Sequence, residues 1–429
     1  MHDRLRASSV TEVTSLDYQS DRPSPPYLWA SREQRLVVAP SQGRVRLELT
    51  PVAGGPALIN DGTQQVIVSP RGAQQVPLRS TNLADERALD PWLVLIDWRR
   101  ATDVRVEGRC VWRDRERLVL LRGDGASAER LLLDPQHGYP LALERREPHY
   151  LWGDVHVSYS WSIWTPVAGS DAVSPMYAFR LLDGEVNLQR RHSASRALPS
   201  DSATLVTLPS TASPLLEAPL EPDTVRVSSN TFLLRTASYT NVVTRQRDTV
   251  FVLDAPVDAD RARRDSAWIG RLFPGRYPIR VIVTDIAWPH IAGLRYWAAQ
   301  GASIVTRESH RPFIDRVLQR RWTLAPDLWE ARRVRRPAVR TVADGLDLAG
   351  GAVRVLPIDG VGSEGALMVF LPAEGFLWAG DYVQPGGPDS FSRVYAREVT
   401  AAVERAGLSP TRVAAMHFPL AAWNARPTR

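Results

Sequence analysis

Lysine and cysteine, two of the common nucleophilic residues, are nearly absent from this chain of 429 residues. All 53 basic residues are arginine, so no lysine is present to form a Schiff base or to attack a substrate. The single cysteine, Cys110, lies in a short run, 109–112, that has the pattern of a strand, where a buried and unreactive thiol is the expected state. One cysteine cannot form an internal disulfide, so the cysteine count does not indicate whether the protein resides in an oxidising or a reducing compartment.

A glycine-rich run at 360–365 fits the spacing of a dinucleotide-binding fingerprint and follows an expected strand. That fingerprint requires a helix next, whereas residues 367–372 have the pattern of a second strand that ends at a proline. Ser363 is not in a nucleophile elbow, because Val361 occupies the first glycine position of that motif. The glycines therefore indicate a tight connection between two strands.

The charge balance does not favour nucleic acid as a partner. The net charge is +6, with an isoelectric point near 9.7, but the arginines are scattered among 47 acidic residues. The densest basic run, 332–336, is short and is interpreted as a solvated face. Five histidines have no ligand spacing and are expected to be satisfied or exposed: His137, His149, His156, His192 and His310.

The elements that must position any site fall into two domains, because the chain is too long for one ordinary core. Residues 1–35 are polar and contain Pro23, Pro25 and Pro26, which predicts an extended polar arm. Residues 36–215 show short alternating runs with turns between them, including a hairpin at 131–145, and predict an antiparallel β domain. A Ser/Thr/Pro-rich segment at 199–222 has the composition of a linker.

From residue 225 onwards the pattern changes to alternating strands and helices. Helices are expected at 260–273, 291–300 and 392–406, and strands at 279–284, 303–306, 353–356, 367–370, 376–379 and 413–416. Such alternation is typical of an α/β domain, here 216–429. No stretch is long and apolar enough to cross a bilayer, and residues 1–16 have no apolar run that would mark a signal peptide.

Several anchors in this second half resemble the metallo-β-lactamase superfamily. They are 278–284 (Pro-Ile-Arg-Val-Ile-Val-Thr), a six-residue loop, 291–295 and 301–305, with 252–256 before them and 370–372, 377–381 and 416–417 after them. The resemblance covers about 225–429 and implies an αββα sandwich. With the first half, the expected fold class is α+β: an antiparallel β domain, as a curved sheet or half-barrel, followed by that sandwich.

The resemblance also implies a metal site, because the family's loop reads His-x-His-x-Asp-His and binds two zinc ions that activate a water. Here the loop at 285–290 reads Asp-Ile-Ala-Trp-Pro-His, and a glycine stands where a later histidine is expected. The methyl group of alanine and the hydrogen of glycine cannot bind a metal, so the first zinc site should be empty. The vacated positions are Asp285, Ala287, Pro289 and Gly362.

Three ligand positions are kept, namely His290, Asp381 and His417. Three nitrogen or oxygen ligands can hold one zinc, although the alternative is that these residues only hydrogen-bond one another. No catalytic residue and no cofactor are therefore expected, with one zinc as the alternative.

The loss of four ligands from a retained scaffold predicts a non-catalytic protein that acts as a binding or structural subunit of a larger, membrane-associated bacterial assembly. The 14 tryptophans and the arginine-only basic surface suit protein partners. The resemblance to the metallo-β-lactamase superfamily favours a periplasmic location, whereas the missing signal peptide favours the cytoplasm. One alternative is a mononuclear-zinc hydrolase. A second is a carrier of lipids or other apolar ligands, because 131–134 with Gly138 and Pro140 resembles the half-barrel of bacterial lipoprotein carriers.

Overall fold

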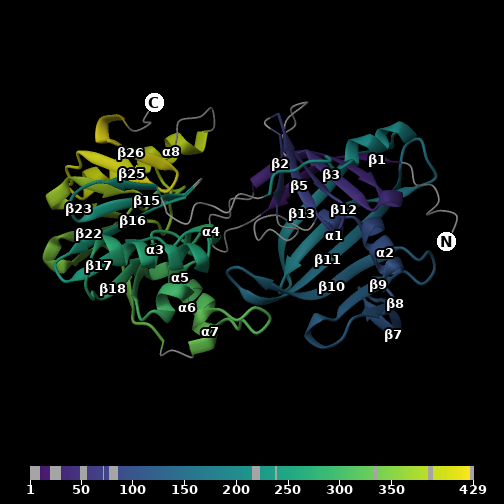
Figure 1. Ribbon diagram of the computed structural model, residues 1–429, viewed down its shortest axis with the longest axis horizontal. Coiled ribbons are helices and arrows are strands. Elements are labelled where there is room, and N and C mark those ends of the chain that lie inside the picture. The colour runs from purple at the N-terminus through teal and green to yellow at the C-terminus, as the bar shows by residue number, and fades with distance from the viewer. Residues whose placement is uncertain are drawn as a thin grey trace. The chain divides into compact units, whose positions relative to one another are not determined.

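The computed structural model describes residues 10–19, 30–48, 56–70, 72–76, 86–214, 223–236, 239–332, 336–384 and 390–425. The chain divides into two compact units, drawn in purple to teal and in green to yellow in Figure 1. The first unit comprises Met1–Ser20, Trp29–His149 and Asp154–Leu216, and the second comprises Asp21–Leu28, Tyr150–Gly153 and Glu217–Arg429. In the described part of the chain, no helix combines the length and apolar character needed to span a membrane.

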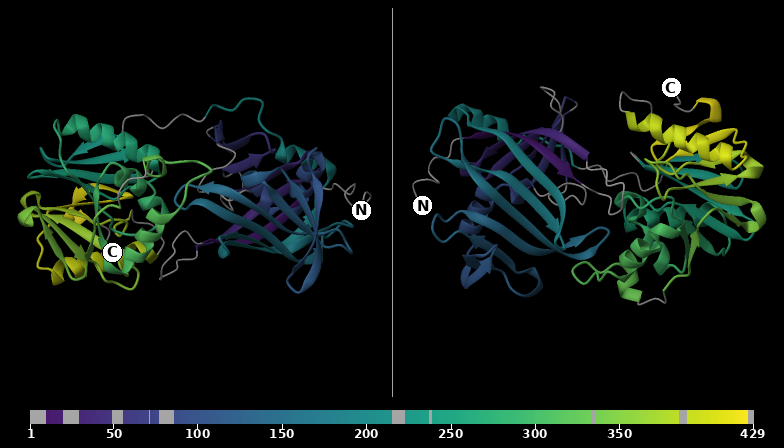
Figure 2. Two further views of the ribbon diagram at one scale, coloured as in Figure 1. Left: turned by 90° about the horizontal axis from the view of Figure 1, so that it is seen from below. Right: turned by 180° about the vertical axis from the view of Figure 1, so that it is seen from behind.

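A large antiparallel sheet of thirteen strands builds the first unit, in the order β6-β5-β4-β3-β2-β1-β13-β12-β11-β10-β9-β8-β7. Figure 2 shows that this sheet is strongly curved. The strands are β1 (Thr11–Gln19), β2 (Ala30–Ala39), β3 (Arg44–Glu48), β4 (Ala57–Asn60), β5 (Gln65–Ser69), β6 (Gly72–Val76), β7 (Arg105–Trp112), β8 (Arg115–Arg122), β9 (Glu129–Leu133), β10 (Pro140–His149), β11 (Gly153–Pro166), β12 (Val173–Leu182) and β13 (Glu185–Ala197).

The segment up to Arg35 differs from the extended arm that its composition predicts. β1 lies inside the sheet, with β2 on one side and β13 on the other. Val13 is buried in the sheet's hydrophobic cluster, and Glu12 forms ion pairs with Arg35 and Arg196 on the two neighbouring strands. Polar side chains here are satisfied across strands instead of by solvent, so the prediction of an arm was wrong for these residues. Residues 1–9 and 20–29 of the expected arm lie outside the described residues.

Two helices, α1 (Glu86–Leu89) and α2 (Pro91–Arg100), connect β6 to β7. The side chain of Asp90 caps α2 by accepting hydrogen bonds from the backbone N–H groups of Trp92 and Leu93, and proline occupies the first turn. Leu93 is fully buried in a cluster with residues of the sheet. The helix therefore packs its apolar side onto the curved sheet.

The second unit contains a seven-stranded sheet, β14-β15-β16-β17-β18-β19-β20, and a six-stranded sheet, β21-β22-β23-β24-β25-β26. Buried side chains from both sheets share one hydrophobic cluster, which includes Leu233 and Phe251 from the first and Val355 and Trp378 from the second. The strands are β14 (Asp223–Arg226), β15 (Thr231–Thr236), β16 (Tyr239–Gln246), β17 (Thr249–Leu253), β18 (Ile279–Ile282), β19 (Ser303–Arg307), β20 (Val339–Val342), β21 (Leu346–Leu348), β22 (Val353–Pro357), β23 (Leu367–Leu371), β24 (Phe376–Trp378), β25 (Arg412–Ala415) and β26 (Phe418–Ala422).

Helices cover these sheets, as Figure 1 shows. Val399 and Val403 of α8 pack in a cluster with the six-stranded sheet. α3 is tied to the seven-stranded sheet by Arg261, which donates to the carbonyl of Leu234 and to Asn241 Oδ1, both at 2.8 Å. The α-helices of this unit are α3 (Ala259–Leu272), α4 (Trp288–Ile291), α5 (Leu294–Ala299), α6 (Arg311–Gln319), α7 (Leu328–Arg332) and α8 (Ser390–Arg405).

The helix expected at 291–300 is instead two short helices, α4 and α5, separated at Gly293. A Cβ on Gly293 would lie 2.9 Å from the Ala262 Cβ and 3.0 Å from the Asp258 carbonyl oxygen. Glycine therefore permits the close approach of α3. The 3₁₀ helices of the chain are Pro40–Gln42, Gly125–Ser127, Ser200–Val206, Glu308–His310, Ala349–Gly351, Pro372–Glu374 and Trp423–Ala425.

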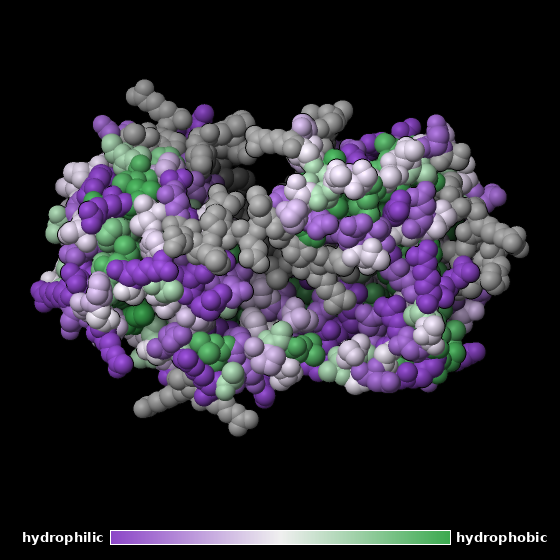
Figure 3. Space-filling model, viewed as in Figure 1, coloured by the Kyte–Doolittle hydropathy of each residue, from purple (hydrophilic) through white to green (hydrophobic). Residues whose placement is uncertain are grey.

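On the face shown in Figure 3, the coloured hydrophobic residues form small patches separated by hydrophilic side chains. This distribution is usual for a surface exposed to water, where single apolar residues need no special explanation.

Candidate metal centre

His290, Asp381 and His417 meet in the second unit from three distant parts of the chain. His290 lies in α4, Asp381 follows β24, and His417 lies between β25 and β26. One nitrogen or oxygen atom from each residue lies within 4.8 Å of the others. His290 and Asp381 are buried, whereas the side chain of His417 is 31% exposed. The structure thus brings together the three ligand positions that the sequence retains.

The backbone explains why these side chains converge. The N–H of His290 donates to the carbonyl of Ala287, and the carbonyl of His290 accepts from the N–H of Ala255, so the turn of α4 that carries His290 is tied to the segment after β17. Gly380, with φ of +57°, precedes Asp381, and its carbonyl accepts from the N–H of Met416. That bond holds the segment that carries His417 beside the segment that carries Asp381.

Asp285 is a hydrogen-bond partner of His290. Its two carboxylate oxygens lie 2.8 and 3.0 Å from Nδ1 of His290, and Oδ1 also accepts from the N–H of Ala287 at 2.8 Å. A histidine that donates Nδ1–H to a carboxylate presents Nε2 to a metal. The sequence-based interpretation of Asp285 as a vacated ligand position did not include this role.

Negative charge dominates the surroundings of His290. Burial lowers the pKa of this imidazole, but the carboxylates of Asp285, Asp381 and Asp254 outweigh burial and raise the pKa to about 9. A site that stabilises an imidazolium so strongly also favours a bound cation. The electrostatics therefore suit a metal ion.

Asp254 is a buried carboxylate beside this site that the sequence analysis did not single out as functional. It accepts hydrogen bonds from the N–H and hydroxyl of Thr284, both at 2.7 Å, and from Nε1 of Trp378 at 2.8 Å. Burial first, and then the charge of Asp285, raise its pKa to about 7. The signal available in the sequence was its place in the run 252–256, at the end of an apolar strand.

The vacated positions take part in ordinary structural contacts. Ala287 is buried at the start of α4, and the carbonyl of Pro289 accepts from the N–H of Val257 at 2.7 Å. The N–H of Gly362 donates to Glu398 Oε1 at 2.9 Å, and a Cβ on Gly362 would lie 2.7 Å from the ring of Tyr395. A ligand side chain at residue 362 would therefore require the side chain of Tyr395 to move.

The retained residues fit one zinc ion. Four ligands at 2.0–2.1 Å in a tetrahedral arrangement lie about 3.3 Å apart, and Nε2 of His417 lies 3.6 Å from Oδ1 of Asp381. Two imidazoles and a carboxylate are a ligand set that zinc accepts, with one position left open. Among the described residues, His290, Asp381 and His417 are the three His, Cys, Asp or Glu side chains that lie close enough together to hold a metal.

The other histidines discussed above are not members of this cluster. His310 is buried, and His137 contacts Asp134 in the first unit. His192 lies 3.3 Å from the hydroxyl of Ser174, and His156 is exposed. The glycine-rich run at 360–365 is followed by β23 and not by a helix, so it lacks the context of a dinucleotide site.

Comparison with solved structures gives metallo-β-lactamases as similar chains. DIM-1 metallo-β-lactamase is 16% identical, with a TM-score of 0.37, and the match covers 48% of this chain and 93% of that one. FIM-1 from Pseudomonas aeruginosa in the mono-zinc form is 10% identical, with a TM-score of 0.38, over 48% and 91%. The enzyme from Hirschia baltica is 15% identical, with a TM-score of 0.37, over 48% and 94%. No protein-family model and no curated protein matches the chain.

Proposed function

We propose that this chain is a non-catalytic protein with a metallo-β-lactamase-type αββα domain, and that it acts as a binding or structural subunit. The observation that carries the proposal is the packing of Gly362. Its N–H donates to Glu398, and a Cβ at this residue would lie against the ring of Tyr395, which supports the proposal that the position where the family places a ligand has no room for one. With Ala287 and Pro289 at two further positions, a dinuclear centre lacks its ligands.

The same domain retains residues for one metal. His290, Asp381 and His417 would hold it, and Asp285 would orient His290 through Nδ1. A bound zinc supplies a fixed positive charge and Lewis acidity. In a structural role, the three ligands cross-link α4, the segment after β24 and the connection between β25 and β26. This role needs no nucleophilic water.

The proposal includes a protein partner in a larger bacterial assembly, placed in the periplasm on the basis of the family resemblance. Support for a partner is compositional: fourteen tryptophans and an exclusively arginine basic set are residue types enriched in interfaces. Full-length protein that stays monomeric, together with affinity purification from its native cell that recovers no specific partner, would refute the subunit role.

Metal analysis separates this function from catalysis. Full-length protein purified without chelators should contain up to one zinc per chain, and His417→Ala should lose it. Esters and β-lactams should be turned over at the same background rate by both proteins. A zinc content near two per chain would contradict the closed position at Gly362.

A mononuclear hydrolase is the second candidate function, and the exposure of His417 favours it. Because that side chain is 31% exposed, the open position of a bound metal could be reached by water and substrate. In that case the unaltered chain would bind zinc and hydrolyse a substrate, and His417→Ala would lose both properties together. That result would reverse the order of the two functions.

A further inference from the structure

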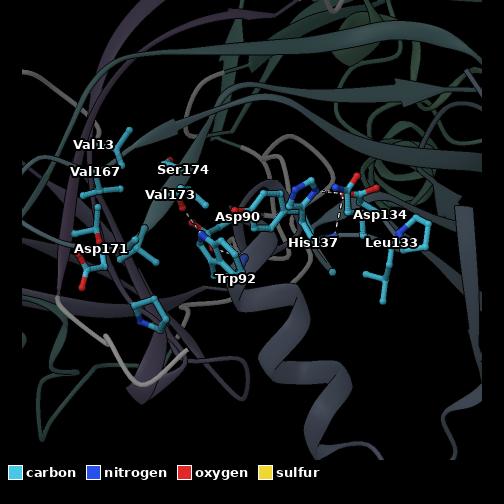
Figure 4. Close-up of a pocket in the computed structure, with 18 of the residues that line it drawn as sticks. Val13, Asp90, Trp92, Leu133, Asp134, His137, Val167, Asp171, Val173 and Ser174 are labelled. Atoms are coloured by element: carbon cyan, nitrogen blue, oxygen red, sulfur yellow. Dashed lines mark hydrogen bonds and ion pairs between the residues drawn. The ribbon is translucent and has the colours of Figure 1, made fainter. Parts of the chain in front are cut away.

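The first unit contains a cavity of about 660 Å³ that is unrelated to the metal centre. It is lined by residues of β1 and β2, the start of α2, the turn between β9 and β10, and the segment 167–174 (Figure 4). This volume lies in the range of small-molecule sites. Val13, Leu133 and Val173 supply apolar surface to its lining.

Aromatic rings form one wall of the cavity. Trp92 and Tyr139 both line it, and Trp164 stacks on Tyr139 at 4.9 Å while meeting Trp92 edge-on at 5.6 Å. Nε1 of Trp92 donates to the carbonyl of Val173 at 2.8 Å, which fixes the orientation of the indole. Rigid aromatic faces of this kind attract cations through their quadrupole.

Carboxylates are the charged groups of the lining. Asp90, Asp134 and Asp171 all line the cavity, whereas no arginine is found among the lining residues that the structure describes, although the chain has 53 basic residues. Figure 4 shows Asp90 beside Trp92, with Asp134 and Asp171 on opposite sides of them.

The three carboxylates differ in their surroundings. Asp134 already contacts Arg117, at 3.3 Å, and His137, whereas Asp171 is exposed. Burial raises the pKa of Asp90, although the N–H groups of Leu93 and Trp92 and the charges of Arg87 and Arg190 act to lower it, so a further cation beside this carboxylate would stabilise its charged form. Asp90 and Asp171 are therefore the carboxylates best suited to attract a ligand.

We propose that this cavity binds an organic cation with an apolar body, such as an alkylammonium compound. The ammonium group packs against Trp92 and Tyr139 near Asp90, and the apolar body contacts Val13, Leu133 and Val173. A fatty acid would bring its own carboxylate towards three others, which is unfavourable in a partly desolvated site. The charge of the head group therefore separates this proposal from a general acyl-chain carrier.

Isothermal titration calorimetry on the full protein chain tests the proposal with three ligands whose alkyl chains are equally long. Each ligand is used below the concentration at which it forms micelles. Decyltrimethylammonium should bind at least about tenfold more tightly than decanol, in line with a desolvated cation–π contact, and decanoate should bind most weakly. Equal affinity for decanol, tighter binding of decanoate, or no binding of the cation would each overturn the proposal.

Substitutions locate the site. Asp90→Asn removes the charge but keeps a good helix cap, and Trp92→Leu removes the aromatic face; each should weaken binding of the cation about tenfold. Asp171→Asn, at an exposed position, tests the charge without risk to folding and should weaken binding in the same direction. Asp201→Asn, an exposed aspartate outside the lining, is the matched control and should bind as the parent does. Unchanged affinity in all three cavity variants would refute the site.

Discussion

The carboxylate of Asp285 accepts a hydrogen bond from Nδ1 of His290 at 2.8 Å, between a ligand position that the sequence predicts to be vacated and one that it predicts to be retained. This bond selects the tautomer that presents Nε2 to a metal. We predict that Asp285→Ala lowers the affinity for zinc about 10- to 100-fold, the usual effect of removing such a partner. Competition with a chromophoric chelator measures the change. Asp347→Ala, at an exposed position on β21, is the control, and an unchanged affinity in Asp285→Ala would contradict an orienting role.

Gly362 offers a test of the closed ligand position. A Cβ there would lie 2.7 Å from the ring of Tyr395, so Gly362→Ala should lower the free energy of unfolding by about 1–3 kcal/mol. Gly345→Ala is a matched control, because its Cβ would meet its neighbours only at 3.7 Å or more. Chemical denaturation compares the two variants. Gly362→His should be destabilised in the same way, and a second bound zinc in that variant would show that the position is open.

The ion pair between Arg261 and Asp265 is almost fully buried, at 1% exposure for each side chain. Arg261→Met leaves the Asp265 carboxylate with only Asn241 as a side-chain hydrogen-bond partner, so we predict a loss of about 3–5 kcal/mol in the free energy of unfolding. The double variant Arg261→Met with Asp265→Leu should be less destabilised than Arg261→Met alone, because it buries no lone charge. Additive losses in this double-mutant cycle would show that the two residues are not coupled.

His310 should make the stability of the fold depend on pH. Burial lowers its pKa to about 4, below the value near 6.5 of an unfolded histidine, because burial and the smaller effect of Arg307 outweigh the charge of Asp285, which raises the pKa. Between these values the unfolded chain takes up a proton that the folded chain does not, so this contribution to stability is complete above pH 6.5 and falls as the pH falls towards 4.

We predict that His310→Gln removes this dependence. Between pH 7.5 and 5, the unaltered chain should lose on the order of 2 kcal/mol more than the variant. Denaturation curves at both pH values measure this difference. His156→Gln, at an exposed position, is the control and should follow the unaltered chain. Parallel losses in His310→Gln and the unaltered chain would mean that His310 titrates normally.

Local patterns predicted many of the elements but not the way they associate. The hairpin at 131–145 and the helix at 392–406 correspond to β9–β10 and α8, since alternation and helical periodicity are local properties. α2 was missed although Asp90 followed by Pro91 is a helix-start signal, because the strands around it dominated the pattern. β1 was missed because the partners of its polar side chains, such as Arg196 for Glu12, lie far away in the sequence.

The two candidate sites also differ in how far the sequence could predict them. His290, Asp381 and His417 could be proposed from motif order, and the structure places their ligand atoms within 4.8 Å of one another. Whether a metal binds there stays a prediction. The cavity of the first unit could not be found from sequence, because Asp90, Tyr139 and other lining residues come from separate elements with no shared spacing.

The central position of β1 also constrains the order of events during biosynthesis. Thr11 pairs with Ala197, so β1 acquires its second neighbour only after nearly the whole first unit has been synthesised. Pairings between such distant segments carry a large loop-closure entropy and slow folding. Until β13 emerges, one edge of β1 is open to other strands, and the nascent chain at this stage is a natural client for chaperones.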